Sequence, residues 1–407
     1  MLNEKLDGKH KIFILMSFLC YVTMSIPFTV QGTLAPLTME FYGINAGQQG
    51  LIMTMQAVGA LGTALFVALK GEQYNKIHAI AFGLFVIGVV GGIIGSAPAF
   101  VFLLVIIVVM GFGGAFIDIM MNGVMSDVYP QRKTTLLPFV HGFYMVGAML
   151  VPVLVTLITN QDRPETFTRP FIVLLIMALV VGTVYLICGR RIRSETPYVN
   201  MDAMKKRVVE NPAEIFKTGN AWFFMAVGYL YFTFQMGTTM WLPTFAIHNT
   251  GVDFTTGAMT LTVFFAGNLV MRFMSPLFFK RFSPRFIYGV FGGISGALMI
   301  VSLFAGNITL MFVLIAAAGF TQGSSVAAFM LTCIDAFPGR TASAASITTI
   351  SSGTAILTAP LWMGVMSTKV GFLAPMLMIC GCLLVAAAMI YFKRYDRGNN
   401  GSHERIG

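Results

Sequence analysis

Apolar runs long enough to cross a membrane dominate this sequence of 407 residues. A helix needs about 20 apolar residues to span a bilayer core, where every backbone group must be hydrogen-bonded internally. Only 10% of the residues are charged, whereas a soluble domain carries about 25%. The sequence therefore predicts an all-α integral membrane protein with twelve transmembrane helices, near residues 12–35, 47–69, 77–97, 99–125, 135–159, 169–189, 219–246, 256–279, 286–305, 308–334, 343–366 and 370–392.

The basic residues are distributed unequally between the two sides of the predicted membrane. With the N-terminus inside, 22 of the 26 Lys and Arg residues fall on the cytoplasmic side, seven of them in the 190–218 loop. Such a bias sets the orientation of a membrane protein. We expect a multi-pass protein of the plasma membrane, the inner membrane in a bacterium, with both termini in the cytoplasm. The net charge of +10 is then an orientation signal, and nucleic acid is not expected as a partner.

The two halves of the chain share a repeat at a constant offset. "GFGGAFIDIMMNGVMSDVYPQRK" and "GFTQGSSVAAFMLTCIDAFPGRT" match at an offset of 208 residues, which pairs Gly111 with Gly319 and Asp127 with Asp335. Two six-helix bundles in parallel orientation explain this pattern. The predicted domains are a bundle of residues 1–189, a cytoplasmic linker of residues 190–218, and a second bundle of residues 219–407 with a short cytoplasmic tail.

With twelve spans and this repeat, the whole chain resembles a transporter of the major facilitator superfamily. The loop "ALKGEQYNKI" resembles a degraded form of that family's signature after the second span, with Glu72 in place of an Asp. The resemblance implies a gating role for Glu72. We place six residues in a structural or gating group: Glu72, Asp127, Arg132, Arg272, Asp335 and Arg340.

Several segments resemble the fucose–proton symporter family in particular. "NLVMRFMSPLFFKRFSPR", "DIMMN", "PFVHGFYMVGAMLVP" and "YLYFTFQMGTTMWLP" are similar to segments of its eighth, fourth, fifth and seventh spans. The resemblance places Asp118 where that family has its protonatable carboxylate. It also implies import by proton symport. The Asn-Asp pair of the family's first span is replaced here by Gln31-Gly32. The coupling scheme of that family therefore cannot be carried over completely to this chain.

Asp118 is the carboxylate in an otherwise apolar predicted span. A charge at this depth costs roughly 2.5–3.5 kcal/mol on insertion scales and marks a functional site by default. Burial favours the protonated form of a carboxyl group, so Asp118 could load and release a proton near neutral pH. The alternative is structural pairing with Arg272 or with a helix N-terminus. The repeat places Val326 at the equivalent position, so this acid was not duplicated.

Two neighbours complete the predicted proton site. Asn122 lies one helical turn after Asp118 on the same face, and it suits either sugar hydroxyls and orientation of the acid or contacts between helices. His141 could relay protons because the ordinary pKa of an imidazole is about 6.5. The alternative for His141 is a neutral ring bonded to a backbone carbonyl.

Arg272 lies within the predicted eighth span, towards its cytoplasmic end near Lys280 and Arg281. An arginine keeps its charge at any useful pH and must be paired or face water. We expect a structural charge network there, and anion binding is the alternative. The sequence contains no cluster of basic residues within the spans of the kind that an organic anion would demand.

Uncharged polar and aromatic residues in both halves predict the substrate. They suit a polyol, whose hydroxyls need partners and whose C–H face can lie on a ring. The competing interpretation is that the amides join helices and that Trp241 anchors a span at the membrane interface. The predicted substrate-binding residues are Gln31, Asn122, Tyr231, Gln235, Trp241, Asn268 and Gln322.

These observations predict a secondary transporter that works by alternating access, with proton symport of a sugar or a similar small polar solute. The alternative is proton-coupled efflux of amphipathic compounds, because 29 Met and 37 Phe residues provide adaptable apolar walls. A transporter-like sensor would need a signalling domain. No cofactor, metal site or enzymatic activity is expected, because no cluster of His, Cys and carboxylate residues is present. The expected coupling ion is H⁺, although Na⁺ stays open; the partners are the solute and the lipid bilayer, and a monomer suffices.

Overall fold

The computed structural model describes residues 7–70, 74–129, 132–193, 217–337 and 341–393. These residues form long helices joined by short connections. The first half contains α1 (Gly8–Tyr42), α2 (Ala46–Lys70), α3 (Lys76–Ile94), α4 (Phe100–Val128), α5 (Lys133–Ile158), the 3₁₀ turn η2 (Pro164–Thr168) and α6 (Arg169–Arg193). The second half contains α8 (Gly219–Thr250), α9 (Phe254–Arg281), α10 (Pro284–Phe286), the π-helical turn η4 (Ile287–Phe291), α11 (Gly292–Leu303), α12 (Ile308–Gln322), α13 (Ser325–Ala336), α14 (Thr341–Val370) and α15 (Leu373–Phe392).

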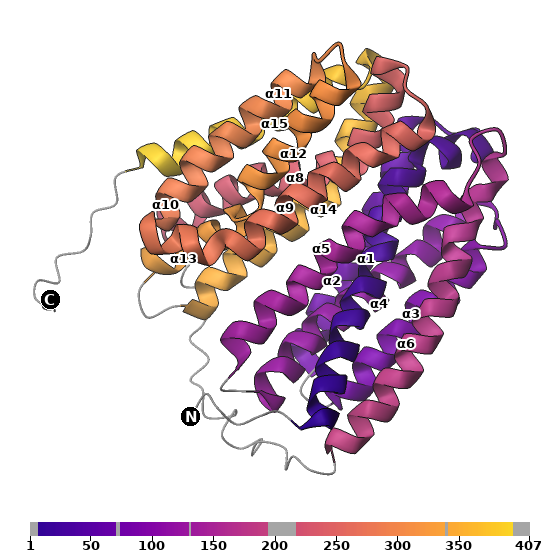
Figure 1. Ribbon diagram of the computed structural model, residues 1–407, viewed down its shortest axis with the longest axis vertical. Coiled ribbons are helices and arrows are strands. Elements are labelled where there is room, and N and C mark those ends of the chain that lie inside the picture. Colours follow the sequence, from indigo (N-terminus) through magenta and orange to yellow (C-terminus); the bar gives the residue numbers. More distant parts are fainter. Residues whose placement is uncertain (1–6, 71–73, 130–131, 194–216, 338–340, 394–407) are drawn as a thin grey trace, which may run out of the picture.

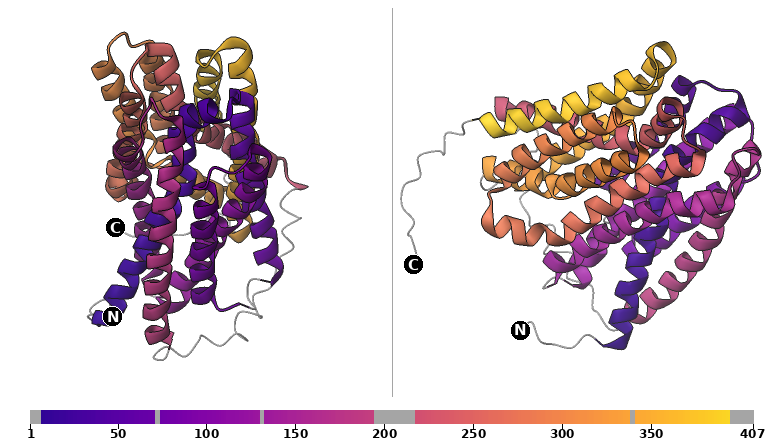
Figure 2. Two further views of the ribbon diagram at one scale, coloured as in Figure 1. Left: turned by 90° about the vertical axis from the view of Figure 1, so that its right-hand side faces the viewer. Right: turned by 45° about the horizontal axis from the view of Figure 1, so that its top comes forward.

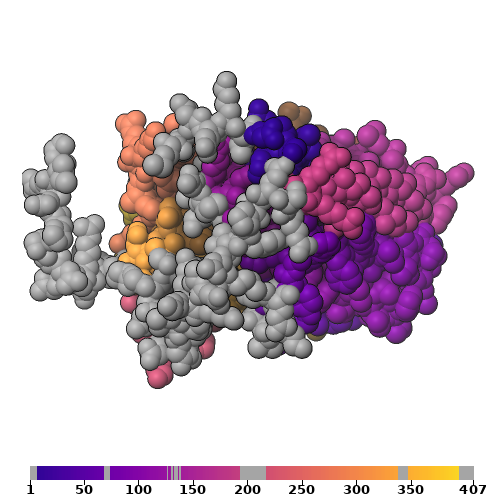
Figure 3. Space-filling view, turned by 90° about the horizontal axis from the view of Figure 1, so that it is seen from below, coloured from indigo at the N-terminus to yellow at the C-terminus, as the bar shows by residue number. Residues whose placement is uncertain are grey.

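The helices are arranged as two bundles, α1–α6 and α8–α15 (Figure 1). The bundles meet at one end and diverge towards the other, where α1 begins and α10 and α13 lie (Figure 1). Figure 2 shows the two bundles from other directions, and Figure 3 shows the end at which they diverge, with one bundle on either side. Across the boundary, α2 packs on α14, α5 on α9 and α1 on α8. Most of the predicted linker, residues 194–216, lies outside the described residues, and residues 190–193 continue α6.

The predicted fold class is confirmed: the described helices form twelve rods in two bundles, and strands are absent from the described residues. Ten helical segments of the described chain are long and apolar enough to cross a membrane. The other two rods are α8 and α14, which run over the predicted spans 219–246 and 343–366. Their sequences contain many hydroxyl and amide side chains, and both helices pack across the boundary between the bundles.

Two rods are less regular than predicted. The span expected at 308–334 is divided at Gly323 and Ser324 into α12 and α13. Gly323 packs so closely on α9 that an added Cβ would clash with the carbonyl oxygen of Asn268. The span expected at 286–305 begins with α10 and η4 before α11. In η4, Gly289 packs against the side chain of Tyr391 on α15. Both irregular places thus coincide with close contacts between a glycine and a neighbouring helix, which hydropathy does not encode.

The 208-residue repeat has a direct structural counterpart. In the first bundle Gly59 of α2 packs on the carbonyl of Val108, and Gly111 of α4 packs on that of Gln56. In the second bundle Gly267 and Gly319 make the same contacts with the carbonyls of Ala316 and Phe264. All four positions correspond at the offset of 208. Small residues let helices approach closely in a membrane, so the duplicated glycines hold α2 on α4 and α9 on α12.

Replacing Gly111 or Gly319 by Ala should therefore destabilise the protein. The added Cβ would clash with a backbone carbonyl on the neighbouring helix, and overpacking of this kind costs about 1–3 kcal/mol. Gly62→Ala is the matched control, because nothing lies within 4 Å of a Cβ at that position and Ala is the better helix former. Thermal unfolding in detergent should show a lower midpoint for the first two variants only. Equal midpoints for all three would contradict the contact.

Candidate functional site

A cavity of about 360 Å³ lies between the two bundles and is lined by side chains of both. The first bundle contributes Asp118 from α4 and His141 from α5. The second contributes Gln235 from α8 and Arg272 from α9. Four residues singled out in the sequence therefore meet at one place, although they come from four helices. A small molecule bound here would touch both bundles.

Asp118 is held by a tyrosine of another helix. The Tyr21 hydroxyl on α1 donates a hydrogen bond of 2.7 Å to Oδ1 of Asp118. Tyr21 is fully buried, while Asp118 is partly exposed and lines the cavity. The described part of the chain contains no ion pair between Asp118 and Arg272. The carboxyl group is thus oriented by a neutral donor and stays open to the cavity on its other side.

Asn122 links Asp118 to His141 through hydrogen bonds. The Asn122 amide donates to the backbone oxygen of Asp118 at 3.0 Å, and its Oδ1 lies 3.1 Å from Nε2 of His141. Because an amide oxygen only accepts, this pairing places a hydrogen on Nε2. The His141 ring also packs edge-on against Tyr21, with ring centroids 5.2 Å apart. Asn122 itself does not line the cavity, so its contacts serve to orient His141.

Arg272 lines the cavity from the second bundle rather than joining a network at the cytoplasmic end. It is the nineteenth residue of α9, and Asp118 is the nineteenth residue of α4, counted from the first residue of each helix. His141 also lines this cavity. The two unlike charges therefore line one cavity from opposite bundles.

Amides and hydroxyls complete the polar part of the wall. Gln56, Thr239 and Ser352 line the cavity beside Gln235. Gln31 lies behind this surface, and its amide nitrogen donates to Oε1 of Gln56. Most of the remaining lining is apolar and includes Met, Phe and Ala side chains. The site thus combines a few directed polar groups with an apolar wall, as small-molecule pockets usually do.

The other predicted substrate residues lie in the second bundle, away from this wall. Tyr231, Trp241, Asn268 and Gln322 are buried and are not among the residues that line the cavity. Gln322 ends α12 where the rod is interrupted. Buried polar atoms without a hydrogen-bond partner in the described structure are unusual. Five of the seven predicted substrate-binding residues contain at least one such unpartnered buried atom: Gln31, Gln235, Trp241, Asn268 and Gln322.

Three of the predicted gating residues, Asp127, Arg132 and Asp335, lie at or near helix ends. Lys76 forms an ion pair of 2.9 Å with Asp127, which ties the start of α3 to the end of α4. Arg132 precedes α5, and Asp335 is exposed near the end of α13. Glu72 and Arg340 lie outside the described residues. Their gating role remains a prediction.

Several polar lining residues were missed in the sequence, among them Tyr21, Gln56 and Tyr144. Tyr21 lies 97 residues from the carboxylate that it contacts. The polar groups of Tyr21 and Gln56, within apolar spans, were the available signal. Gln56 precedes Gly59 by one turn, and its backbone oxygen is the one that Gly111 approaches. A small-residue packing motif thus also positions part of the site.

Close backbone contacts join the bundles at the end where they meet. A Cβ added at Gly50 would clash with the carbonyl oxygen of Pro360, and one at Gly364 with that of Ala46. Thr54 also donates to the carbonyl of Leu357 at 3.0 Å. These contacts join α2 to α14 and separate the cavity from this end. Closure therefore depends on glycines at the boundary.

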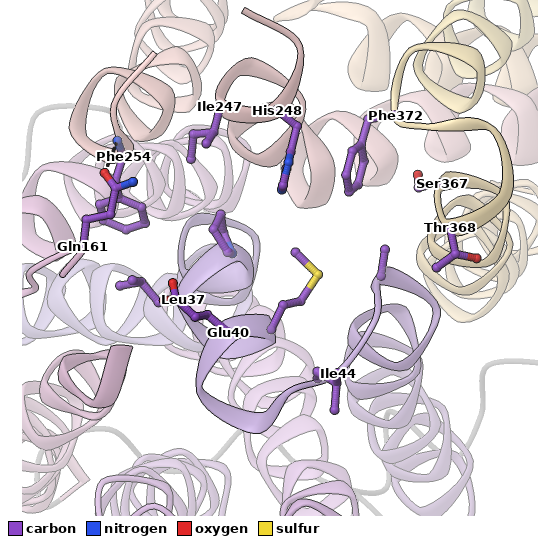
Figure 4. Close-up of a pocket in the computed structure, with 13 residues that line it drawn as sticks. Leu37, Glu40, Ile44, Gln161, Ile247, His248, Phe254, Ser367, Thr368 and Phe372 are labelled. Atoms are coloured by element: carbon purple, nitrogen blue, oxygen red, sulfur yellow. Dashed lines mark hydrogen bonds between the residues drawn. The ribbon is translucent and has the colours of Figure 1, made fainter. Parts of the chain in front are cut away.

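A second pocket, of about 520 Å³, lies at the closed end (Figure 4). The His248 ring stacks on Phe372, with ring centroids 5.1 Å apart. On another side of the pocket, Gln161 accepts a hydrogen bond of 3.0 Å from the backbone of Phe254 (Figure 4). That bond ties the segment before α6 to the start of α9. One side of the pocket is thus bounded by a contact between the two halves of the chain.

Replacing Gly50 by Val should hold the closed end open, because its side chain would meet the backbone of Pro360. A cysteine placed at Met53, which lines the central cavity, should then react faster with a membrane-impermeant thiol reagent applied from the closed end. Gly62→Val, on the same helix and with no neighbour within 4 Å, is the control. Equal labelling rates in the two variants would argue against a gate at Gly50.

Comparisons with known proteins give a consistent result. The family profile described as Major Facilitator Superfamily matches residues 17–348. No curated protein matches the chain. Similar solved structures are numerous, and all those compared below share 12–15% identity with this chain. At that identity they show the fold alone.

Three solved structures illustrate the likeness. A bacterial homologue of the human lysosomal transporter Spinster, in an inward-facing and unoccupied conformation, has a TM-score of 0.79 at 15% identity and covers 95% of this chain and 97% of its own. A D-xylose–proton symporter has a TM-score of 0.76 at 12% identity, with 95% and 98% covered. A nucleoside transporter has a TM-score of 0.73 at 12% identity, with 94% and 100% covered.

Proposed function

This chain belongs to the major facilitator superfamily of transporters, and on that premise we propose that it imports a sugar or a similar small polar solute by proton symport. The main support for this proposal is the position of the Asp118 carboxyl group, which lines the cavity between the bundles and accepts a hydrogen bond from Tyr21. A carboxyl group at this position can exchange its proton with water that enters the cavity. Protonation removes the negative charge of this carboxylate, so it changes the net charge that is enclosed when the bundles close around the site.

Alternating access follows from the arrangement of the bundles. They meet at one end and diverge at the other (Figure 1), and the Spinster homologue with the same fold was solved facing inward. With both termini in the cytoplasm, as the distribution of basic residues predicts, the diverging end faces the cytoplasm. We assign the protein to the plasma membrane, the inner membrane in a bacterium. One chain contains both bundles, so a monomer is sufficient.

The sugar-like solute is supported by the polar part of the wall. Gln56, Gln235, Thr239 and Ser352 offer donors and acceptors for hydroxyl groups. The resemblance of several spans to the fucose–proton symporter family points the same way. Proton coupling in a D-xylose–proton symporter of the same fold is a precedent for that chemistry on this architecture.

Asp118→Asn tests the coupling. The amide keeps the size of the side chain but cannot release a proton, so proton-driven accumulation should fall to the level of empty vesicles while counterflow of solute persists. Uptake and counterflow in proteoliposomes measure the two. Asp253→Asn is the matched control, because Asp253 caps α9 outside the cavity and Asn caps a helix equally well. If Asp118→Asn still concentrated solute against its gradient, Asp118 would not be the coupling site.

Efflux of amphipathic compounds is the second candidate, and the apolar lining favours it. Met24, Met53, Met145, Met236 and Met240 all line the cavity. Flexible thioether side chains adapt to ligands of different shapes. A drug-susceptibility panel on an overexpressing strain separates the two functions, because efflux raises resistance to several unrelated compounds and sugar import does not.

A further inference from the structure

The guanidinium of Arg272 is the least expected group in the cavity. It lies inside a membrane-spanning helix, where a permanent positive charge is costly and marks a functional position. The repeat places Ala64 at the equivalent position of the first bundle. Arg272, like Asp118, was therefore not duplicated with the scaffold. Each bundle contributes one unduplicated charge to the cavity between them.

The described residues provide no direct counterion for this arginine. Arg272 forms no ion pair with a carboxylate of the described chain, and Asp118 is the acidic residue among those that line the cavity. Asp118 is on the opposite bundle and accepts its hydrogen bond from Tyr21. The guanidinium thus faces the cavity with its hydrogen-bond donors available to a ligand.

The remaining titratable groups near the pair are neutral donors or lie far from the cavity. Tyr21 of α1 and His141 and Tyr144 of α5 line the cavity beside Asp118, and Tyr231 of α8 lies within electrostatic reach of Arg272. Lys76 of α3 is paired with Asp127 at the end of α4. The charge of the cavity is therefore set by Asp118 and Arg272 when His141 is neutral.

Two states of the cavity are electrically neutral. With Asp118 ionised and the cavity empty, the two charges cancel. With Asp118 protonated, the wall carries one positive charge, and one bound monoanion cancels it. Neutral states are favoured when the bundles close around the site, because an uncompensated charge is costly in a low dielectric. Proton and anion should thus bind together.

We propose that the solute carries a single carboxylate bound by Arg272, so that the protein transports a hydroxylated monocarboxylic acid, such as a sugar acid, together with one proton. This inference rests on the proposed proton loading of Asp118. A guanidinium donates two parallel hydrogen bonds to a carboxylate. A phosphate ester carries about −1.5 to −2 charges at pH 7, which one arginine does not balance. Gln56, Gln235 and Thr239 are then available for the hydroxyl groups.

The coupling is reciprocal. A proton on Asp118 removes the negative charge that competes with the solute for Arg272, and a bound carboxylate favours the proton in turn. Linkage requires the two effects to be equal in free energy. Affinity for the acid should therefore be higher when Asp118 is protonated than when it is ionised. The affinity for a neutral sugar should not depend on the charge of Arg272 in this way.

The test compares acids with neutral sugars of equal size. Gluconate, glucuronate and galacturonate are set against sorbitol, glucose and galactose, and binding to the purified protein is measured by thermal shift and calorimetry at pH 6 and pH 8. We expect at least one acid, and none of the neutral partners, to stabilise the protein, and to do so more at pH 6. Arg272→Gln should weaken binding of that acid about tenfold or more, and Arg272→Lys should weaken it less. Asp118→Asn should bind it equally at both pH values.

The ligand-free midpoint of each variant shows whether it folds, and Arg272→Lys preserves the charge if Arg272→Gln does not fold. Stabilisation by neutral sugars alone, by none of the six compounds, or equally in wild type and Arg272→Gln would overturn the proposal. Proton uptake by proteoliposomes separates this failure from that of the proposed function. If a neutral sugar drives proton movement, symport is retained and the proposal of a carboxylate on the solute is rejected. If the acid binds to the wild type, loses that binding in Arg272→Gln and yet drives no proton movement, the anion site is retained and symport is rejected.

Discussion

The cost of leaving a polar or charged group without a partner inside the membrane governs the arrangement of this protein. Backbone groups meet that constraint by forming helices, and side chains meet it by being apolar almost everywhere. Asp118 and Arg272 are the exceptions in the cavity, and they line it from different bundles. Neither is paired directly with the other. Their balance therefore depends on what occupies the cavity and on whether Asp118 holds a proton.

The fold was largely predictable because its causes are local or periodic. Apolar runs of sufficient length define the rods, and the constant offset of 208 residues defines two related bundles. The structure adds the contacts that the repeat preserves, namely Gly59 and Gly111 in one half and Gly267 and Gly319 in the other. The breaks between α12 and α13 and within the rod of α10, η4 and α11 were not predictable. At both breaks a glycine packs on a neighbouring helix, a contact that a single helix's sequence does not reveal.

The candidate site was predictable only in part. Asp118 stands out in the sequence because a carboxylate is rare in an apolar span. Tyr21 and Gln56 do not, since Tyr and Gln occur in many helices and their role depends on partners far along the chain. The position of Arg272 relative to Lys280 and Arg281 indicated a charge network at a helix end. The structure instead places its side chain on the cavity wall, because helical periodicity decides which way it faces.

The internal duplication explains why the packing glycines recur in both bundles whereas the charged residues of the site do not. Packing glycines work equally well in both bundles, so both copies kept them. A buried charge has no such symmetry: two acids would repel each other across the cavity, and two arginines would leave it strongly positive. One acid in the first bundle and one arginine in the second keep the empty cavity neutral while Asp118 is ionised. That arrangement also makes the protonation of a single residue sufficient to change the net charge that the solute meets.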